Sequence, residues 1–262
     1  MEKKYLPGYK WQSKIIKDIM DLNRNTMQKR AIALLVIFLI VFVHKGLAQE
    51  QETNDAGFIK IFNGENLQGW DGDTTYWRVE TGILIGEVTA ATILKRNSFI
   101  IWKEKQPGDF ELLVDYRVSA HGNSGINYRS ALIDSLPFAL KGYQADIDGE
   151  DNWSGQNYEE RGREFLALRG QKVIIGNAEK PLVIGSLGSK NSLQTFIKKE
   201  EWNKCRLVVK NNRMQHYINN VLMSDVTDND ETNRTNKGYV GVQVHVGPPM
   251  KIEYRNFMFK EL

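Results

Sequence analysis

The sequence of 262 residues contains one cysteine, Cys205, and six prolines. A single cysteine excludes an intramolecular disulfide, so the fold must depend on its hydrophobic core. The zinc spacings H-E-x-x-H and C-x-x-C are absent, as are G-x-x-x-x-G-K-[ST], G-x-G-x-x-G and G-x-S-x-G. These absences remove the local signals of zinc enzymes, nucleotide-binding proteins and α/β-hydrolases. Cys205 lies in a strand-like stretch without an activating neighbour, which predicts a buried, unreactive thiol.

A strong positive charge is also missing from most of the chain. The formal net charge is +3, but residues 1–48 hold nine Lys and Arg against three acids. The remaining residues therefore hold 26 basic against 29 acidic side chains. A mildly acidic body argues against nucleic acid as a partner.

No apolar run reaches the roughly 20 residues that span a bilayer. The longest is the run of thirteen at 31–43, which follows Lys29 and Arg30 and precedes the small residues of Gly46-Leu47-Ala48. This pattern predicts a signal peptide at 27–48, cleaved after Ala48, with a short uncleaved anchor as the alternative. We expect a periplasmic or secreted protein that meets the membrane only through this segment. We then expect Met27 to be the true start of the protein and residues 1–26 to be an extension added by a wrongly assigned start codon.

The body, residues 56–262, shows short alternating segments separated by turn residues. The clearest is 109–118, which places Phe110, Leu112, Val114 and Tyr116 on one face. Asn-Asn pairs at 211–212 and 219–220 suit tight hairpin turns, and no βαβ rhythm is present. One helical stretch is expected near 192–199. The pattern predicts one all-β domain, an antiparallel β-sandwich.

Three predicted strands carry polar side chains on one face, each set spaced two residues apart. We expect these strands to be neighbours, so that their polar faces form a groove that hydrogen-bonds sugar hydroxyls, although solvated strand faces would give the same pattern. The predicted groove residues are Asn127 and Arg129 in 125–129, Gln144, Asp146 and Asp148 in 142–148, and Gln243 and His245 in 240–246.

The segment 151–163 concentrates charged and aromatic residues between two strands. It is either a solvated loop with internal ion pairs or a rim of the groove. In the second interpretation Glu159 or Glu160 is an acid or base, Arg161 and Arg163 bind oxygen atoms, and Tyr158 contacts the substrate.

Six segments carry a resemblance to a known family. They are F-N-G-E-N-L-Q-G-W at 62–70, W-R-V-E-T-G-I-L at 77–84, G-D-F-E-L at 108–112, G-N-S-G-I at 122–126, G-Y-Q-A-D-I at 142–147 and R-N-F-M-F-K-E-L at 255–262. In this order they resemble the 3-keto-disaccharide hydrolase family, long catalogued as DUF1080. The resemblance implies a concanavalin A-like jelly roll and cleavage of glycosides already oxidised at C3.

A ketone at C3 acidifies the C2 hydrogen, so such an enzyme needs a base, an acid and a group that stabilises an oxyanion. The candidate bases are Asp146, Glu159 and His245, and the oxyanion candidates are Arg129 and Arg161. Asp146, Asp148 and a glutamate could hold a divalent cation, although no calcium-loop spacing is present. The alternative function is a non-catalytic carbohydrate-binding module, and a structural envelope protein is a third.

Overall fold

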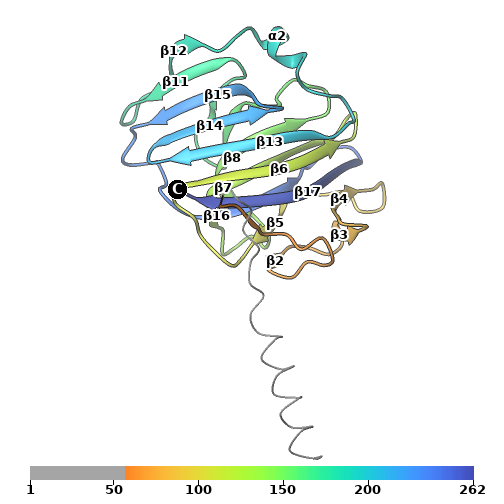
Figure 1. The fold of residues 1–262 in the computed structure, drawn as a ribbon. Coiled ribbons are helices and arrows are strands. Elements are labelled where there is room, and N and C mark those ends of the chain that lie inside the picture. Colours follow the sequence, from red (N-terminus) through yellow and green to blue (C-terminus); the bar gives the residue numbers. More distant parts are fainter. Residues whose placement is uncertain (1–56) are drawn as a thin grey trace, which may run out of the picture. The chain divides into compact units, whose positions relative to one another are not determined.

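The computed structural model describes residues 57–262. The predicted extension and signal peptide lie outside the described residues. Within them, the chain forms two β-sheets packed face to face (Figure 1). The concanavalin A-like all-β jelly roll expected from the sequence is confirmed. No helix of this part is long and apolar enough to cross a bilayer.

The larger sheet has ten strands. Its order is β12 (Leu182–Ser186), β11 (Gln171–Ile175), β15 (Val221–Asp228), β14 (Arg213–Ile218), β13 (Asn203–Lys210), β6 (Phe110–Val118), β17 (Met250–Glu261), β4 (Ile83–Val88) and β3 (Trp77–Glu80), and β1 (Ile59–Lys60) also pairs with β17. All of its pairs are antiparallel except β11 with β15.

The smaller sheet has seven strands and carries the polar faces. Its order is β10 (Glu164–Ala167), β9 (Asn157–Glu160), β8 (Leu140–Asp148), β7 (Asn123–Leu132), β16 (Tyr239–Val244), β5 (Ser98–Trp102) and β2 (Trp70–Asp71). The three predicted polar strands are β7, β8 and β16. They are neighbours in the order β8, β7, β16, as expected.

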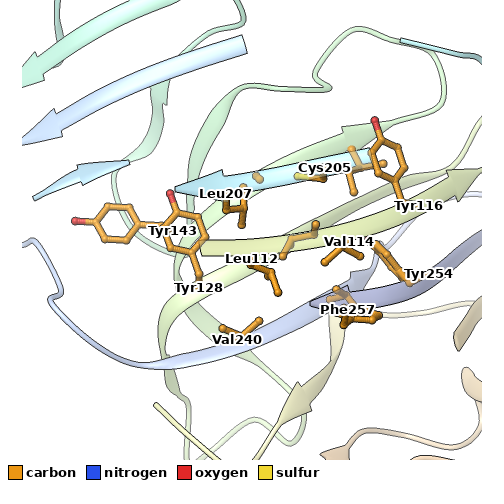
Figure 2. Close-up of a cluster of buried hydrophobic side chains, with 14 of the residues drawn as sticks. Leu112, Val114, Tyr116, Tyr128, Tyr143, Cys205, Leu207, Val240, Tyr254 and Phe257 are labelled. Carbon is orange, nitrogen blue, oxygen red and sulfur yellow. The ribbon is translucent and has the colours of Figure 1, made fainter. Parts of the chain in front are cut away.

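The core fills the space between the sheets (Figure 2). Strand β6 alternates buried and half-buried residues along its full length, so the period-2 pattern read at 109–118 corresponds to one core-facing side. Cys205 is buried in this core, and its burial raises the thiol pKa to about 12. The prediction of an unreactive thiol is therefore supported by its surroundings.

Turn chemistry explains several boundaries. Asn219 and Asn220 both have positive φ, the backbone conformation of a tight hairpin turn, and they connect β14 to β15. The α-helix of the described part, α2 (Lys190–Gln194), begins two residues before the helical stretch expected at 192–199 and is shorter than that stretch. Ser189 caps it, because its hydroxyl accepts a hydrogen bond from the Ser192 N–H.

Candidate functional site

The strand register of the smaller sheet aligns the predicted polar residues in rows. Asn127 lies opposite Gln144 of β8 and opposite Gly241 of β16, and Gly125 lies opposite Asp146. Directly paired residues of adjacent strands project to the same side of a sheet. Asn127, Gln144 and Asp146 therefore lie on the same face of the sheet, as their two-residue spacing predicted.

A pocket of about 200 Å³ opens on this face. Its volume is below the roughly 300–1,000 Å³ of drug-sized ligand sites. Its lining combines strand residues with the segment after β8, and comprises Asn97, Asn123, Gln144, Asp146, Trp153, Gln156, Tyr158, Glu160, Phe165 and His245.

Asp146 lies half-buried in the pocket and is held by two amides. Gln144 Nε2 donates to Oδ1 over 2.6 Å, and Gln156 Nε2 donates to Oδ2 over 2.5 Å. Burial raises the pKa of Asp146 to about 7, and the negative charges of Glu160 and Asp148 act in the same direction. The two amide donors oppose this shift because they favour the ionised form. At neutral pH, this carboxyl group is thus poised between its two protonation states.

Glu160 is a second buried carboxyl group in the pocket. Burial raises its pKa, while a hydrogen bond from Asn97 and the positive charge of Arg161 oppose the rise. Asn97 Nδ2 donates to Glu160 Oε1 over 3.3 Å, and Asn97 Oδ1 accepts from the backbone N–H of Val246. Asn97 therefore links the glutamate to the chain segment that follows β16.

His245 lies directly after β16, beside that segment. Its Nδ1 is 2.5 Å from the carbonyl oxygen of Val246. A carbonyl can only accept, so Nδ1 carries a proton and Nε2 of the neutral ring is the free, basic nitrogen. His245 can consequently accept a proton at Nε2 or, once protonated, donate one there.

An aromatic wall forms one side of the pocket. Phe165 of β10 lies between Tyr158 and Trp153, with ring centroids 5.2 Å and 5.6 Å away. Trp153 is 41% exposed and Phe165 is 45% exposed, so both rings keep open surface. Tyr158 points to the pocket from β9, as the sequence predicted for the rim.

The predicted substrate-binding residues Asn127 and Gln243 lie beneath the pocket floor instead of lining it. Both are fully buried. Gln243 Nε2 donates to Gln144 Oε1 over 3.2 Å, so Gln243 supports the amide that holds Asp146. The two polar side-chain atoms of Asn127 have no hydrogen-bond partner.

Arg129 does not share the face of Asn127, and that prediction is wrong. The pairing of β7 with β8 shifts register between Tyr128 and Ala131, and Arg129 adopts a positive φ. This bulge turns the side chain away, because one extra residue reverses the alternation of faces. Its guanidinium is buried on Asp109 Oδ1 and on the carbonyls of Gly108 and Asn211.

Glu159 and Arg163 also lie elsewhere than predicted. In β9, Tyr158 and Glu160 face the pocket, so Glu159 faces the opposite side. Arg163 Nε lies 2.6 Å from Glu159 Oε2, and Arg163 Nη2 lies 2.6 Å from Asp228 Oδ2. This pair belongs to a buried ion network and does not reach the pocket.

Arg161 stays near the site without lining it. Its Nε lies 3.7 Å from Glu160 Oε1 at the end of β9. It therefore acts on the pocket through the charge of Glu160. Of the two arginines considered for oxyanion stabilisation, Arg161 alone is close to the pocket.

Glu160, predicted as an acid or base in alternative to Glu159, lines the pocket. Five other lining residues were absent from the predicted set, namely Asn97, Asn123, Trp153, Gln156 and Phe165. Three of them had a signal in the sequence, because Asn123 lies in the motif at 122–126 and Trp153 and Gln156 lie in the charged segment 151–163. Asn97 and Phe165 lie in none of the segments that carried a prediction.

The arrangement considered for a divalent cation is not formed. The Asp148 carboxylate accepts hydrogen bonds from the backbone N–H groups of Glu150, Asn152 and Trp153. This side chain thereby holds the loop that follows β8. Within residues 57–262, no three His, Cys, Asp or Glu side chains are grouped as metal ligands.

Comparison with known proteins gives one family and several similar structures. Residues 57–260 match the 3-keto-alpha-glucoside-1,2-lyase-like domain. Two candidate glycosyl hydrolases from Parabacteroides distasonis are similar in structure. One is 20% identical, covering 81% of this chain and 99% of its own, with a TM-score of 0.54. The other is 17% identical, covering 78% and 99%, with a TM-score of 0.53.

A Bacillus subtilis protein of unknown function with a galectin-like fold is also similar. It is 13% identical, covers 82% of this chain and 95% of its own, and has a TM-score of 0.50. At these identities the structural similarities show the fold alone. The chain has no match among curated proteins.

Proposed function

Because the chain belongs to the 3-keto-alpha-glucoside-1,2-lyase-like family, we propose that it cleaves glycosides whose sugar carries a ketone at C3. Membership of this family makes it a carbohydrate-active protein. The observation that carries the proposal is Asp146, a carboxyl group on the pocket floor with a pKa of about 7 and two amide donors. A base that works at neutral pH needs a pKa close to that value.

In the proposed reaction, Asp146 removes the proton at C2, which the neighbouring ketone has made acidic. The electron pair of the C2–H bond forms an enediolate. That pair then forms the C1–C2 double bond, and the C1–O bond breaks with its electrons on the leaving oxygen. Water adds across the double bond afterwards and restores a 3-keto sugar.

The leaving oxygen takes its proton from the group formed by Glu160 and His245. The raised pKa of Glu160 keeps it protonated to a higher pH than an ordinary glutamate. His245, once it has taken up a proton at Nε2, can return that proton to Glu160. The amides of Asn97, Asn123 and Gln156 supply N–H donors for the oxyanion at C3.

The test of this proposal compares two glucosides. The protein is incubated with methyl 3-keto-glucoside and with unoxidised methyl glucoside. Release of methanol from the first alone supports the elimination route. Equal release from both would indicate ordinary glycoside hydrolysis, which uses two carboxyl groups without needing a ketone.

A carbohydrate-binding module is the second candidate, because a polar floor beside an aromatic wall would also bind a sugar without reaction. This function requires no carboxyl group with a raised pKa. Binding of 3-keto-glucoside without any product would support it.

The proposal includes export through the segment at 27–48. A mature protein that begins at Gln49 is the expected form. Its place of action would then be the periplasm or the medium.

A further inference from the structure

The pocket divides into a polar floor and an apolar wall. The floor carries the amides and carboxyl groups described above. The wall consists of Trp153, Tyr158 and Phe165, which come from the loop after β8 and from β9 and β10. Trp153 and Phe165 together leave open aromatic surface at the pocket mouth, at 41% and 45% exposure.

The wall is held in place by buried polar contacts. The Asp148 carboxylate accepts from the Trp153 backbone N–H over 3.2 Å. Arg169, which is 4% exposed, donates to the carbonyls of Asp151 and Ser154, each over 2.8 Å. Two buried side chains, Asp148 and Arg169, thus hold the backbone of the loop that carries Trp153, and its exposed indole is a built feature of the site.

The polar groups at the wall are few. Lys190 Nζ lies 5.5 Å from the centroid of the Trp153 ring and does not line the pocket. A sugar hydroxyl that is buried needs a hydrogen-bond partner, and the floor provides several such partners whereas the wall provides only the Tyr158 hydroxyl. A flat aromatic ring needs none, and it gains from contact with other aromatic rings.

Resting on the proposed function, we propose that this wall is a subsite for an aromatic aglycone. The 3-keto sugar lies on the floor, and the aromatic group attached at C1 lies against Trp153 and Phe165. The enzyme then acts preferentially on aryl 3-keto-glucosides.

The chemistry of the leaving group agrees with this assignment. In the elimination, Asp146 takes the C2 proton and the C1–O electrons leave with a phenolic oxygen. A phenol has a pKa of about 10, far below that of an alkyl alcohol. The phenolate therefore leaves with little help from an acid and takes its proton afterwards, which completes the balance.

The experiment measures binding without reaction. Three kinds of ligand that are not oxidised at C3 are titrated into the protein: phenyl glucoside, methyl glucoside and the disaccharide trehalose. The phenyl and methyl glucosides are each tested as the α and the β anomer. Because aromatic contacts contribute about 0.5–1.5 kcal/mol each, phenyl glucoside should bind roughly 2- to 10-fold more tightly than methyl glucoside for each ring that it contacts. Trp153→Ala and Phe165→Ala should each reduce this preference.

Phe196→Ala is the matched control, because Phe196 is 49% exposed and does not line the pocket. It should keep the preference intact. Equal binding of phenyl and methyl glucosides would overturn the proposal, and so would a preference for trehalose over phenyl glucoside. These outcomes are independent of the proposed function, which is judged by turnover of methyl 3-keto-glucoside.

Discussion

The Asp146→Asn substitution tests the assignment of the base. In the wild type each Asp146 oxygen accepts from one amide, Gln144 on Oδ1 and Gln156 on Oδ2. Asparagine keeps the shape but places its own NH2 opposite one of these donors. Gln156 can rotate its amide to present an oxygen, whereas the oxygen of Gln144 already accepts from Gln243. We therefore expect the variant to fold.

Loss of a general base lowers kcat by roughly 10²- to 10⁴-fold, which is about 3–5 kcal/mol in the barrier. The pH profile should change as well. Burial raises the pKa of Asp146 from 3.8 to about 7, so wild-type kcat/KM should rise as the pH approaches neutrality and the carboxyl ionises. The variant should lack this rise, because asparagine does not titrate.

The same substitution has a consequence for stability. A raised pKa in the folded state means that folding favours the protonated form. Wild-type stability should therefore fall as the pH rises from about 4 to about 7. Asparagine removes this loss, so above pH 7 the variant should be the more stable protein. The upper bound on this difference in the free energy of unfolding is about 4 kcal/mol. Contact of the half-buried carboxylate with water reduces the difference.

The assays are steady-state kinetics on a 3-keto-glucoside and thermal unfolding across the pH range. Asp134→Asn, at an exposed position away from the pocket, is the matched control and should change neither. Wild-type kcat in a folded Asp146→Asn variant would refute the reasoning about the base.

Four other changes should separate chemistry from structure. Glu160→Gln should lower kcat by roughly 10²-fold or more without lowering Tm. Glu159→Gln should instead reduce the free energy of unfolding by about 1–3 kcal/mol, because it breaks the Arg163 network. The reverse pattern would place the chemistry on the other face of β9. Arg129→Ala should cost about 2–3 kcal/mol and leave KM unchanged, and a raised KM at unchanged Tm would contradict its placement. In Gly125→Ala, the new Cβ would lie 2.5 Å from Gln144 Cδ, so the Gln144 amide should shift away from Asp146. The rise of kcat/KM with pH that follows ionisation of Asp146 should then occur about one pH unit higher. An unchanged pH profile would show that Gln144 does not tune the pKa of Asp146. Mass spectrometry of exported protein should find Gln49 at the N-terminus, and retention of Met27 would exclude cleavage after Ala48.

The fold was predictable because its signals are local. The alternation in 109–118 requires only that one side of a strand be buried. The Asn219–Asn220 pair predicts a hairpin because asparagine tolerates positive φ. That β7, β8 and β16 are neighbours could be predicted because each strand carries polar residues on one face, and such faces were expected to lie together.

The site was predictable up to the first irregularity of the backbone. The alternation of side chains along a strand correctly placed Asn127, Gln144 and Asp146 on one face. The same reasoning was wrong for Arg129, because the hydrophobic pattern of the sequence does not reveal a β-bulge. The choice between Glu159 and Glu160 depended on partners remote in sequence. Asp228 lies 65 residues beyond Arg163, and this contact draws Arg163 and Glu159 together away from the pocket.

Asn97 and Phe165 show what sequence reasoning could not reach. Each comes to the pocket from a strand or strand end whose own pattern is unremarkable. Phe165 gains its role from Trp153 and Tyr158, and Asn97 gains its role from Glu160 and Val246. Their significance follows from tertiary contacts alone.

The most direct test of the central claim follows the hydrogen at C2. A 3-keto-glucoside deuterated at C2 is turned over in ordinary water, and the deuterium content of the released 3-keto sugar is measured, with the free 3-keto sugar incubated alone as the control for spontaneous exchange. Elimination by Asp146 predicts that the deuterium is lost from the product beyond the level of that control. Full retention of deuterium at C2 in the released sugar would contradict proton abstraction and the account that depends on it.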